Sequence, residues 1–209
     1  MDVTDNAESR GTFARRSVLG VGFGGAALSL LPLLFGRGTA TASAPTTTAP
    51  PKRPTVDDVD LLGFAQGVEM AARALYDMAL GTSSLSGSDR DVFVTLRESH
   101  EAYVQAFSGM LGRQAPLQVN DDVVALLEAD FTGSTAAVLA AAYTLESTAV
   151  ATHRDIVREL QGTDGANLVA SILVIEACHG TVLAAMAGKT DLDELLVNEE
   201  AAALAPAKG

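Results

Sequence analysis

The sequence predicts an all-α protein, a four-helix bundle in which one long connection joins the second helix to the third. The chain is rich in Ala, Val and Leu, has no Trp, and shows helical rather than alternating apolar spacing from Asp57 onward. Short links separate the first two and the last two predicted helices, whereas residues 113–133 separate the second from the third. A connection of that length can run back along the bundle and leave the second and third helices parallel.

Apolar periodicity and the residues that interrupt it give the bounds of each helix. The expected helices, with a short acidic one inside the long connection, span residues 56–80, 89–111, 120–131, 134–161 and 166–187. Asp57 and Asp58 are favourable at the N-terminus of the first helix, where the helix dipole attracts negative charge. The segments GTSSLSGS and GTDG form the two short links, and Pro116 lies in the long connection.

Residues 1–44 are expected to be an export signal and not part of the fold. Arg15 and Arg16 precede an uncharged run over 17–36, and ATASA then offers small residues to a signal peptidase. The stretch ARRSVLG resembles a twin-arginine signal, which implies the twin-arginine export machinery as a partner and cleavage after Ala44. An uncleaved membrane anchor is the alternative, because an uncharged run of this length can just span a bilayer.

The rest of the chain divides into a linker, a bundle and a tail. Residues 45–55 are predicted as a disordered Pro/Thr linker, residues 56–189 as the bundle, and residues 190–209 as an acidic tail with one more short helix. The chain has 14 Lys and Arg against 26 Asp and Glu. This balance argues against nucleic acid or an anionic membrane surface as a partner, since both require basic patches. The single cysteine, Cys178, excludes a disulfide within the chain.

Glutamate and histidine interrupt the apolar stripe of each long helix. In LVIEACHGTVLAAM, Glu176 and His179 lie inside the stripe, and their spacing of three places both on one helix face. Glu69, His100 and Glu146 stand near the midpoints of the other three helices. Because midpoints of similar helices lie level in a bundle, we expect Glu69, His100, Glu146 and Glu176 to meet in one layer, with His179 one turn away along the fourth helix. Carboxylates gathered in a dry core repel one another unless protons or a cation compensate them.

Three further residues on the inner faces are weaker candidates. His153 lies two turns beyond Glu146, roughly 10 Å along the axis, so we expect it away from the shared layer, as a hydrogen-bonded core histidine. Tyr103 and Tyr76 are interpreted as core aromatics with tethered hydroxyls. His153 and Tyr103 are nevertheless kept as a second tier of metal ligands.

The segment from Asp57 to Ala187 resembles the ferritin-like superfamily and, more narrowly, exported actinobacterial ferritin-like domain proteins. The matching residues stand in three motifs: Glu69 in GVEMAARALY, Glu146 in YTLESTAVATH, and Glu176 with His179 in IEACHG. Di-iron members of the superfamily carry Glu-x-x-His on the second helix, where this sequence has His100-x-x-Tyr103. The loss of a bridging carboxylate favours a mononuclear site or an asymmetric pair.

Carboxylate and imidazole together suit Fe, Mn or Zn. We therefore expect a transition metal, Fe or Mn with Zn also open, in the bundle core, with the ligands Glu69, His100, Glu146, Glu176 and His179. The resemblance implies chemistry on O₂ or peroxide if iron is bound, which makes a metal-dependent oxidoreductase the enzyme class to consider.

The alternative is a metal-free structural or interaction module, in which buried Glu and protonated His form a hydrogen-bond layer. Arg73 offers a further alternative, since it could draw Glu69 to the surface. Metal identity, substrate and whether the chain forms a homo-oligomer stay open.

Overall fold

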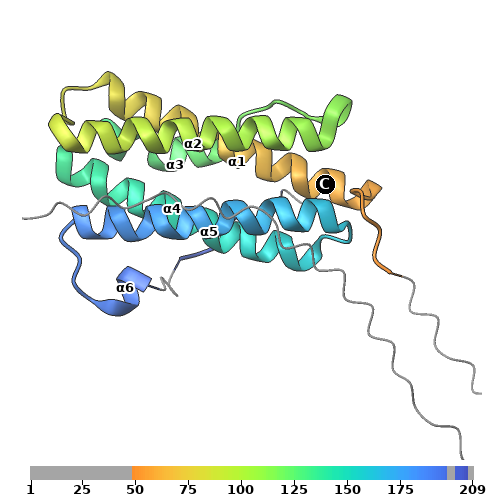
Figure 1. Cartoon of the computed structure of the whole chain (residues 1–209). Coiled ribbons are helices and arrows are strands. Elements are labelled where there is room, and N and C mark those ends of the chain that lie inside the picture. Colours follow the sequence, from red (N-terminus) through yellow and green to blue (C-terminus); the bar gives the residue numbers. More distant parts are fainter. Residues whose placement is uncertain (1–48, 197–200, 207–209) are drawn as a thin grey trace, which may run out of the picture. The chain divides into compact units, whose positions relative to one another are not determined.

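Two antiparallel helical hairpins form the bundle (Figure 1). The computed structural model describes residues 49–196 and 201–206, and every regular element in those ranges is helical. In chain order the elements are α1 (Val56–Gly81), α2 (Gly87–Leu111), the 3₁₀ turn η1 (Gly112–Gln114), α3 (Asp121–Phe131), α4 (Thr135–Glu159), α5 (Thr163–Met186) and α6 (Leu192–Leu196). α1 pairs with α2 and α4 with α5. The predicted all-α bundle is therefore confirmed, whereas the predicted export signal lies outside the described residues.

Side-chain contacts across the bundle establish the direction of α2 relative to α4. His100 of α2 lies beside Glu146 of α4, and Phe107 of α2 lies beside His153 of α4, with ring centroids 6.3 Å apart. The two pairs follow one another in the same order along both helices, so α2 and α4 run parallel. This is the crossover topology that the long connection predicts.

The crossover itself lies along α1. The backbone amide of Leu117 donates to the side-chain oxygen of Gln66 at 3.1 Å, and the amide of Asn120 donates to the carbonyl of Gly67 at 3.0 Å. A Cβ on Gly67 would lie 3.0 Å from the carbonyl oxygen of Gln118. Glycine at this position therefore allows the returning chain to approach the helix closely, and α3 then packs between α1 and α4.

A buried polar layer divides the apolar core into two clusters. The larger side chains of the first cluster are Tyr76, Phe93, Phe131, Leu145 and Leu183. Those of the second are Leu62, Phe107, Ile156, Val169 and Ile172. On each of the four long helices the buried glutamates and histidines lie between positions that belong to these two clusters. The polar layer is therefore enclosed by apolar packing at both ends.

The segment before α1 is fastened to the start of α5. The amides of Thr163 and Asp164 donate to the carbonyls of Pro51 and Lys52 at 3.0 and 2.9 Å. These contacts satisfy amides that would otherwise be unpaired at a helix N-terminus, which explains why α5 begins at Thr163, within the link predicted from GTDG. The bundle thus extends upstream into the segment predicted as a linker. A Cβ on Gly162 would lie 2.6 Å from a backbone oxygen of this segment, so glycine is required there.

Asp58 joins the first turn of α1 to the α4–α5 turn. Its carboxylate accepts hydrogen bonds from the amides of Thr55, Gln161 and Gly162 at 2.7, 2.8 and 2.8 Å. Burial opposes ionisation, but these amides lower the pKa of Asp58 below its usual value.

Replacement of Asp58 by Asn is expected to reduce the free energy of unfolding by about 2 kcal/mol at pH 7, since hydrogen bonds to a charged group are the strong ones. Because the folded-state pKa is the lower one, this stabilisation is complete above about pH 4 and is lost as the pH falls through the folded pKa. Urea unfolding of wild type, Asp58→Asn and the exposed control Asp60→Asn at pH 7 and at acidic pH measures it. A penalty that is unchanged by acid would contradict this account.

Candidate metal centre

Six acidic and imidazole side chains meet between the two hairpins. They come from all four long helices: Glu69 of α1, His100 of α2, Glu146 and His153 of α4, and Glu176 and His179 of α5. Five of them are fully buried, and the side chain of His179 keeps 13% exposure. Spacings of seven residues on α4 and three on α5 return to the same helix face, so both members of each pair point inward.

His100 connects two carboxylates. Its Nδ1 lies 2.7 Å from Oε2 of Glu69, and its Nε2 lies 3.1 Å from Oε1 of Glu146. The second oxygen of Glu146, Oε2, lies 3.4 Å from Nδ1 of His179. The single histidine of α2 therefore reaches α1 and α4 at once.

His153 makes the matching connection on the other side of Glu69. Its Nε2 lies 3.2 Å from Oε1 of Glu69, and its Nδ1 lies 2.7 Å from Oε2 of Glu176. Imidazole and carboxylate thus alternate without interruption, in the order His179, Glu146, His100, Glu69, His153 and Glu176.

Two tyrosines border the series. The hydroxyl of Tyr76 donates to Oε1 of Glu146 at 2.6 Å, and its ring stacks on His100 with centroids 5.3 Å apart. Burial and the neighbouring Glu146 raise the pKa of Tyr76 well above its usual value, so the phenol keeps its proton as a donor. Tyr103 packs edge-on against His100 at 5.7 Å, and its buried hydroxyl has no hydrogen-bond partner. The expected tethered hydroxyl is therefore found on Tyr76 and not on Tyr103.

Protons and carboxylates can balance each other within the layer. Burial opposes the charged form of His100, yet Glu146 and Glu69 raise its pKa well above the usual value. Burial opposes the charged form of His153 as well, yet Glu176 and Glu69 raise its pKa to about 9. Burial raises the pKa of Glu176 to about 7, whereas His100 lowers the pKa of Glu146 to about 2 against the effect of burial. Both buried imidazoles thus favour the protonated form at neutral pH unless a cation replaces their protons.

The donor atoms nevertheless form two groups that fit a metal ion. His100, Glu146 and His179 make up one group and Glu69, His153 and Glu176 the other, each with ligand atoms within 4.8 Å of one another. Ligands that share an ion at about 2.1 Å are at most about 4.2 Å apart, so only a small contraction is needed.

Several buried donor atoms in this layer also lack a hydrogen-bond partner, and each belongs to one of the two groups. They are Glu69 Oε1, Glu146 Oε2, Glu176 Oε1, His153 Nε2 and His179 Nδ1. Four of them face one another in the two longer contacts described above, at 3.2 and 3.4 Å, without the geometry of a hydrogen bond, and Glu176 Oε1 makes no such contact. Unpartnered buried polar atoms are rare and call for an explanation, of which an ion is one.

The structure brings together all the side chains predicted as primary ligands, and it adds His153. The expectation that His153 lies away from the layer is wrong, because the layer is thicker than one helical turn. Glu146 belongs to one group, and His153, two turns further along α4, belongs to the other. Arg73 does not draw Glu69 outward, since Arg73 pairs with Glu101 at 2.8 Å and Glu69 is fully buried. Metal ligation by these residues remains a prediction.

The role of Tyr76 at the layer was missed from the sequence. Tyr76 follows Glu69 by seven residues on α1, as His153 follows Glu146 by seven on α4. Glu69 contacts His153, and Tyr76 contacts Glu146, so the two helices present these pairs in opposite order. The repeated two-turn spacing was the available signal for this contact.

A four-helix bundle with a crossover and a glutamate–histidine layer at mid-height belongs to the architectural class that holds metals between facing helices. Residues 57–189 match the family model of the ferritin-like domain. Because this match covers more than half of the chain, the protein belongs to the ferritin-like domain family. No curated protein and no solved structure matches the chain.

Proposed function

We propose that this protein binds two transition-metal ions, iron or manganese with zinc as a third candidate, in the layer between its hairpins. The observation that carries the proposal is the set of buried carboxylate and imidazole atoms that make no hydrogen bond and face one another in two groups. Mixed imidazole and carboxylate ligands favour these ions over magnesium or calcium. Family membership supports the same conclusion, since metal sites in such bundles are built from inward-facing Glu and His.

The proposed pair of ions is asymmetric. The group of His100, Glu146 and His179 offers two imidazoles and one carboxylate, whereas the group of Glu69, His153 and Glu176 offers one imidazole and two carboxylates. His153 on α4 supplies an imidazole that compensates for the missing Glu-x-x-His motif on α2. The sequence alone favoured either a mononuclear site or an asymmetric pair, and the position of His153 favours the pair.

Bound iron or manganese would supply redox chemistry towards O₂ or peroxide, which would make the protein a metal-dependent oxidoreductase. The protein's own side chains would prepare the site. Tyr76 keeps a proton on its hydroxyl and orients Glu146 by donating to Oε1. The apolar clusters on both sides keep bulk water away from the buried carboxylates, which strengthens their attraction for a cation.

Metal content tests the proposal directly. Elemental analysis of natively purified protein should find more than one equivalent of metal in wild type. Glu176→Ala and His179→Ala should each lose roughly half of it, because each removes a ligand from a different group. The exposed control Glu98→Ala should match wild type. Equal metal content in wild type and both ligand variants would defeat the proposed site.

The second candidate function is a metal-free structural or interaction module. The 2.7 Å contacts of His100 with Glu69 and of His153 with Glu176 favour it, because they already pair each imidazole with a carboxylate. Such a layer would give register to a bundle rich in Ala and Leu. The stability of a protein with such a layer would not change with chelators but would change as the histidines titrate. A protein with a metal layer would lose stability when chelators are added at neutral pH.

We also propose that the protein is exported by the twin-arginine route and cleaved after Ala44. Arg15, Arg16 and the uncharged run that follows them support this in the sequence. Substitution of both arginines by lysine should trap the precursor inside the cell. Unchanged secretion would indicate another route, and a full-length membrane-bound product would indicate an uncleaved anchor.

A further inference from the structure

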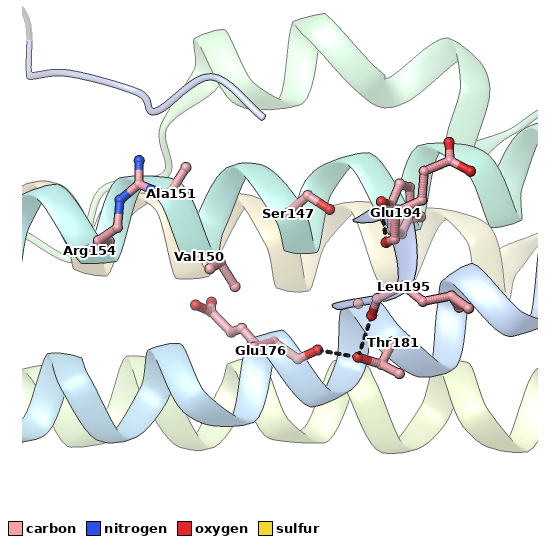
Figure 2. Close-up of a pocket in the computed structure, with 11 residues that line it drawn as sticks. Ser147, Val150, Ala151, Arg154, Glu176, Thr181, Glu194 and Leu195 are labelled. Carbon is pink, nitrogen blue, oxygen red and sulfur yellow. Dashed lines mark hydrogen bonds between the residues drawn. The ribbon is translucent and has the colours of Figure 1, made fainter. Parts of the chain in front are cut away.

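A small pocket lies between α4 and α5 and is partly covered by α6 (Figure 2). Its cavity volume is about 120 Å³, which accommodates several water molecules or a molecule of a few heavy atoms. Small side chains leave this space, among them Ser147 and Ala151 of α4 and Ala177 and Gly180 of α5. A Cβ on Gly180 would meet only Glu146 Cβ, at 3.9 Å, so no close backbone contact accounts for this glycine.

The pocket reaches the candidate metal centre at Glu176. This residue lines the pocket although it is fully buried, and its Oε1 has no hydrogen-bond partner. Figure 2 shows its carboxylate extending from α5 towards Val150 on α4. The other oxygen, Oε2, is held by His153 at 2.7 Å, so the carboxylate has one edge on the layer and one edge free.

The charges around the pocket favour an anion. Glu194 pairs with Lys189 at 2.7 Å, and Glu176 pairs with His153, so both acidic groups are compensated. Arg154 lines the pocket with its side chain 53% exposed, and its nearest carboxylate, that of Asp155, lies 3.4 Å away. Asp155 makes its shorter contact, 2.8 Å, with another arginine. Among the described residues, Arg154 is therefore the one basic side chain that lines the pocket, and its contact with Asp155 is long.

α6 closes one end of the pocket. Thr181 of α5 donates from its hydroxyl to the carbonyl of Leu195 at 3.1 Å, and Tyr143 of α4 donates to the carbonyl of Glu194 at 2.7 Å. These contacts hold α6 across both helices of the hairpin. The expected route into the pocket is therefore past Arg154, at the end away from α6.

We propose that this pocket admits a small anion, of azide or hydroperoxide size, to the group formed by Glu69, His153 and Glu176, and that Arg154 attracts it. The proposal rests on the proposed metal function, because a bound ion gives the anion its final partner. The proposal also implies that the two groups differ in access from solvent, since Glu176 is the one member of the six-residue series that lines this pocket.

Azide is the probe for the first experiment. Azide added to ferric protein should give a charge-transfer absorption, and the rate at which it appears reports access. Ala177→Phe places a large ring at an exposed position on the pocket wall and should slow the rate at least tenfold with metal content unchanged. Ala185→Phe, an exposed position on the same helix outside the pocket, is the matched control. Equal azide rates in the two variants would overturn the proposal.

Arg154→Ala should weaken azide binding about fivefold, as expected for one partly exposed charge several ångströms away. The weakening should shrink at high salt, because exposed charges are screened. Unchanged affinity at low salt would overturn the role of Arg154.

A second experiment needs no metal. Ser147→Cys introduces a thiol on the pocket wall, and Cys178→Ser removes the exposed natural one. Iodoacetate and iodoacetamide are similar in size and differ in charge, and both alkylate a thiolate with loss of iodide. Arg154→Ala should lower the ratio of iodoacetate to iodoacetamide rates severalfold, and an unchanged ratio would overturn the anion preference. Elemental analysis of the same samples tests the proposed function separately. The absence of bound metal from wild type would defeat that function.

Discussion

Saturation with Mn²⁺ is expected to raise the melting temperature of the protein by about 10 °C over the EDTA-treated protein. A ligand that binds only the folded state stabilises it by about 4 kcal/mol at a thousandfold excess over its dissociation constant. For a domain of this size each kcal/mol corresponds to about 3 °C. The unfolded chain cannot compete for the ion, because Glu69, His100, Glu146 and Glu176 come from four separate helices.

The controls separate specific binding from general ion effects. Mg²⁺ and Ca²⁺ should give little stabilisation, since imidazole is a poor ligand for them. Glu69→Gln should lose most of the Mn²⁺ effect, because Glu69 belongs to one group and contacts His100 of the other. Calorimetry at pH 7 measures all of these transitions. A melting temperature that is the same with Mn²⁺, Mg²⁺ and EDTA would favour the metal-free module.

The helices and the position of the polar layer near their midpoints could be predicted from the sequence because both depend on local patterns. Apolar spacing predicted the long helices, and the lengths of their connections predicted the crossover. Glu69, His100, Glu146 and Glu176 could be assigned to the same buried layer because each stands near the middle of its helix. The family model over residues 57–189 supports the same bundle.

What could not be predicted depends on how far each helix is displaced along its neighbours. A displacement of one turn moves a side chain about 5 Å, and periodicity within one helix does not determine it. For this reason His153 was expected outside the layer, and the partner of Arg73 on α1 could not be identified as Glu101 of α2. The thickness of the layer is likewise a property of the packed bundle, and it decides whether one metal group or two can form.

His153→Leu is expected to reduce the free energy of unfolding of the metal-free protein by about 3–5 kcal/mol at pH 7, the usual effect of removing one partner from a buried ion pair. The loss exceeds that of ordinary packing because Glu176 and Glu69 both lose their contacts with His153. Leu is close to His in volume, so the cavity contribution is small. Urea unfolding in EDTA measures the difference.

The double variant His153→Leu/Glu176→Met shows whether the uncompensated charge is the cause. Met matches Glu in length, and it removes the carboxylate that the single variant leaves without its imidazole. We expect the double variant to recover about half of the stability lost by His153→Leu, since replacement of a whole buried pair by apolar groups is often close to neutral. If the effects of the single variants His153→Leu and Glu176→Met simply add in the double variant, His153 stabilises the bundle through packing alone. If the double variant recovers stability and also binds no metal, the His153–Glu176 pair serves metal binding and is not needed for folding, because the bundle then folds with apolar side chains in its place.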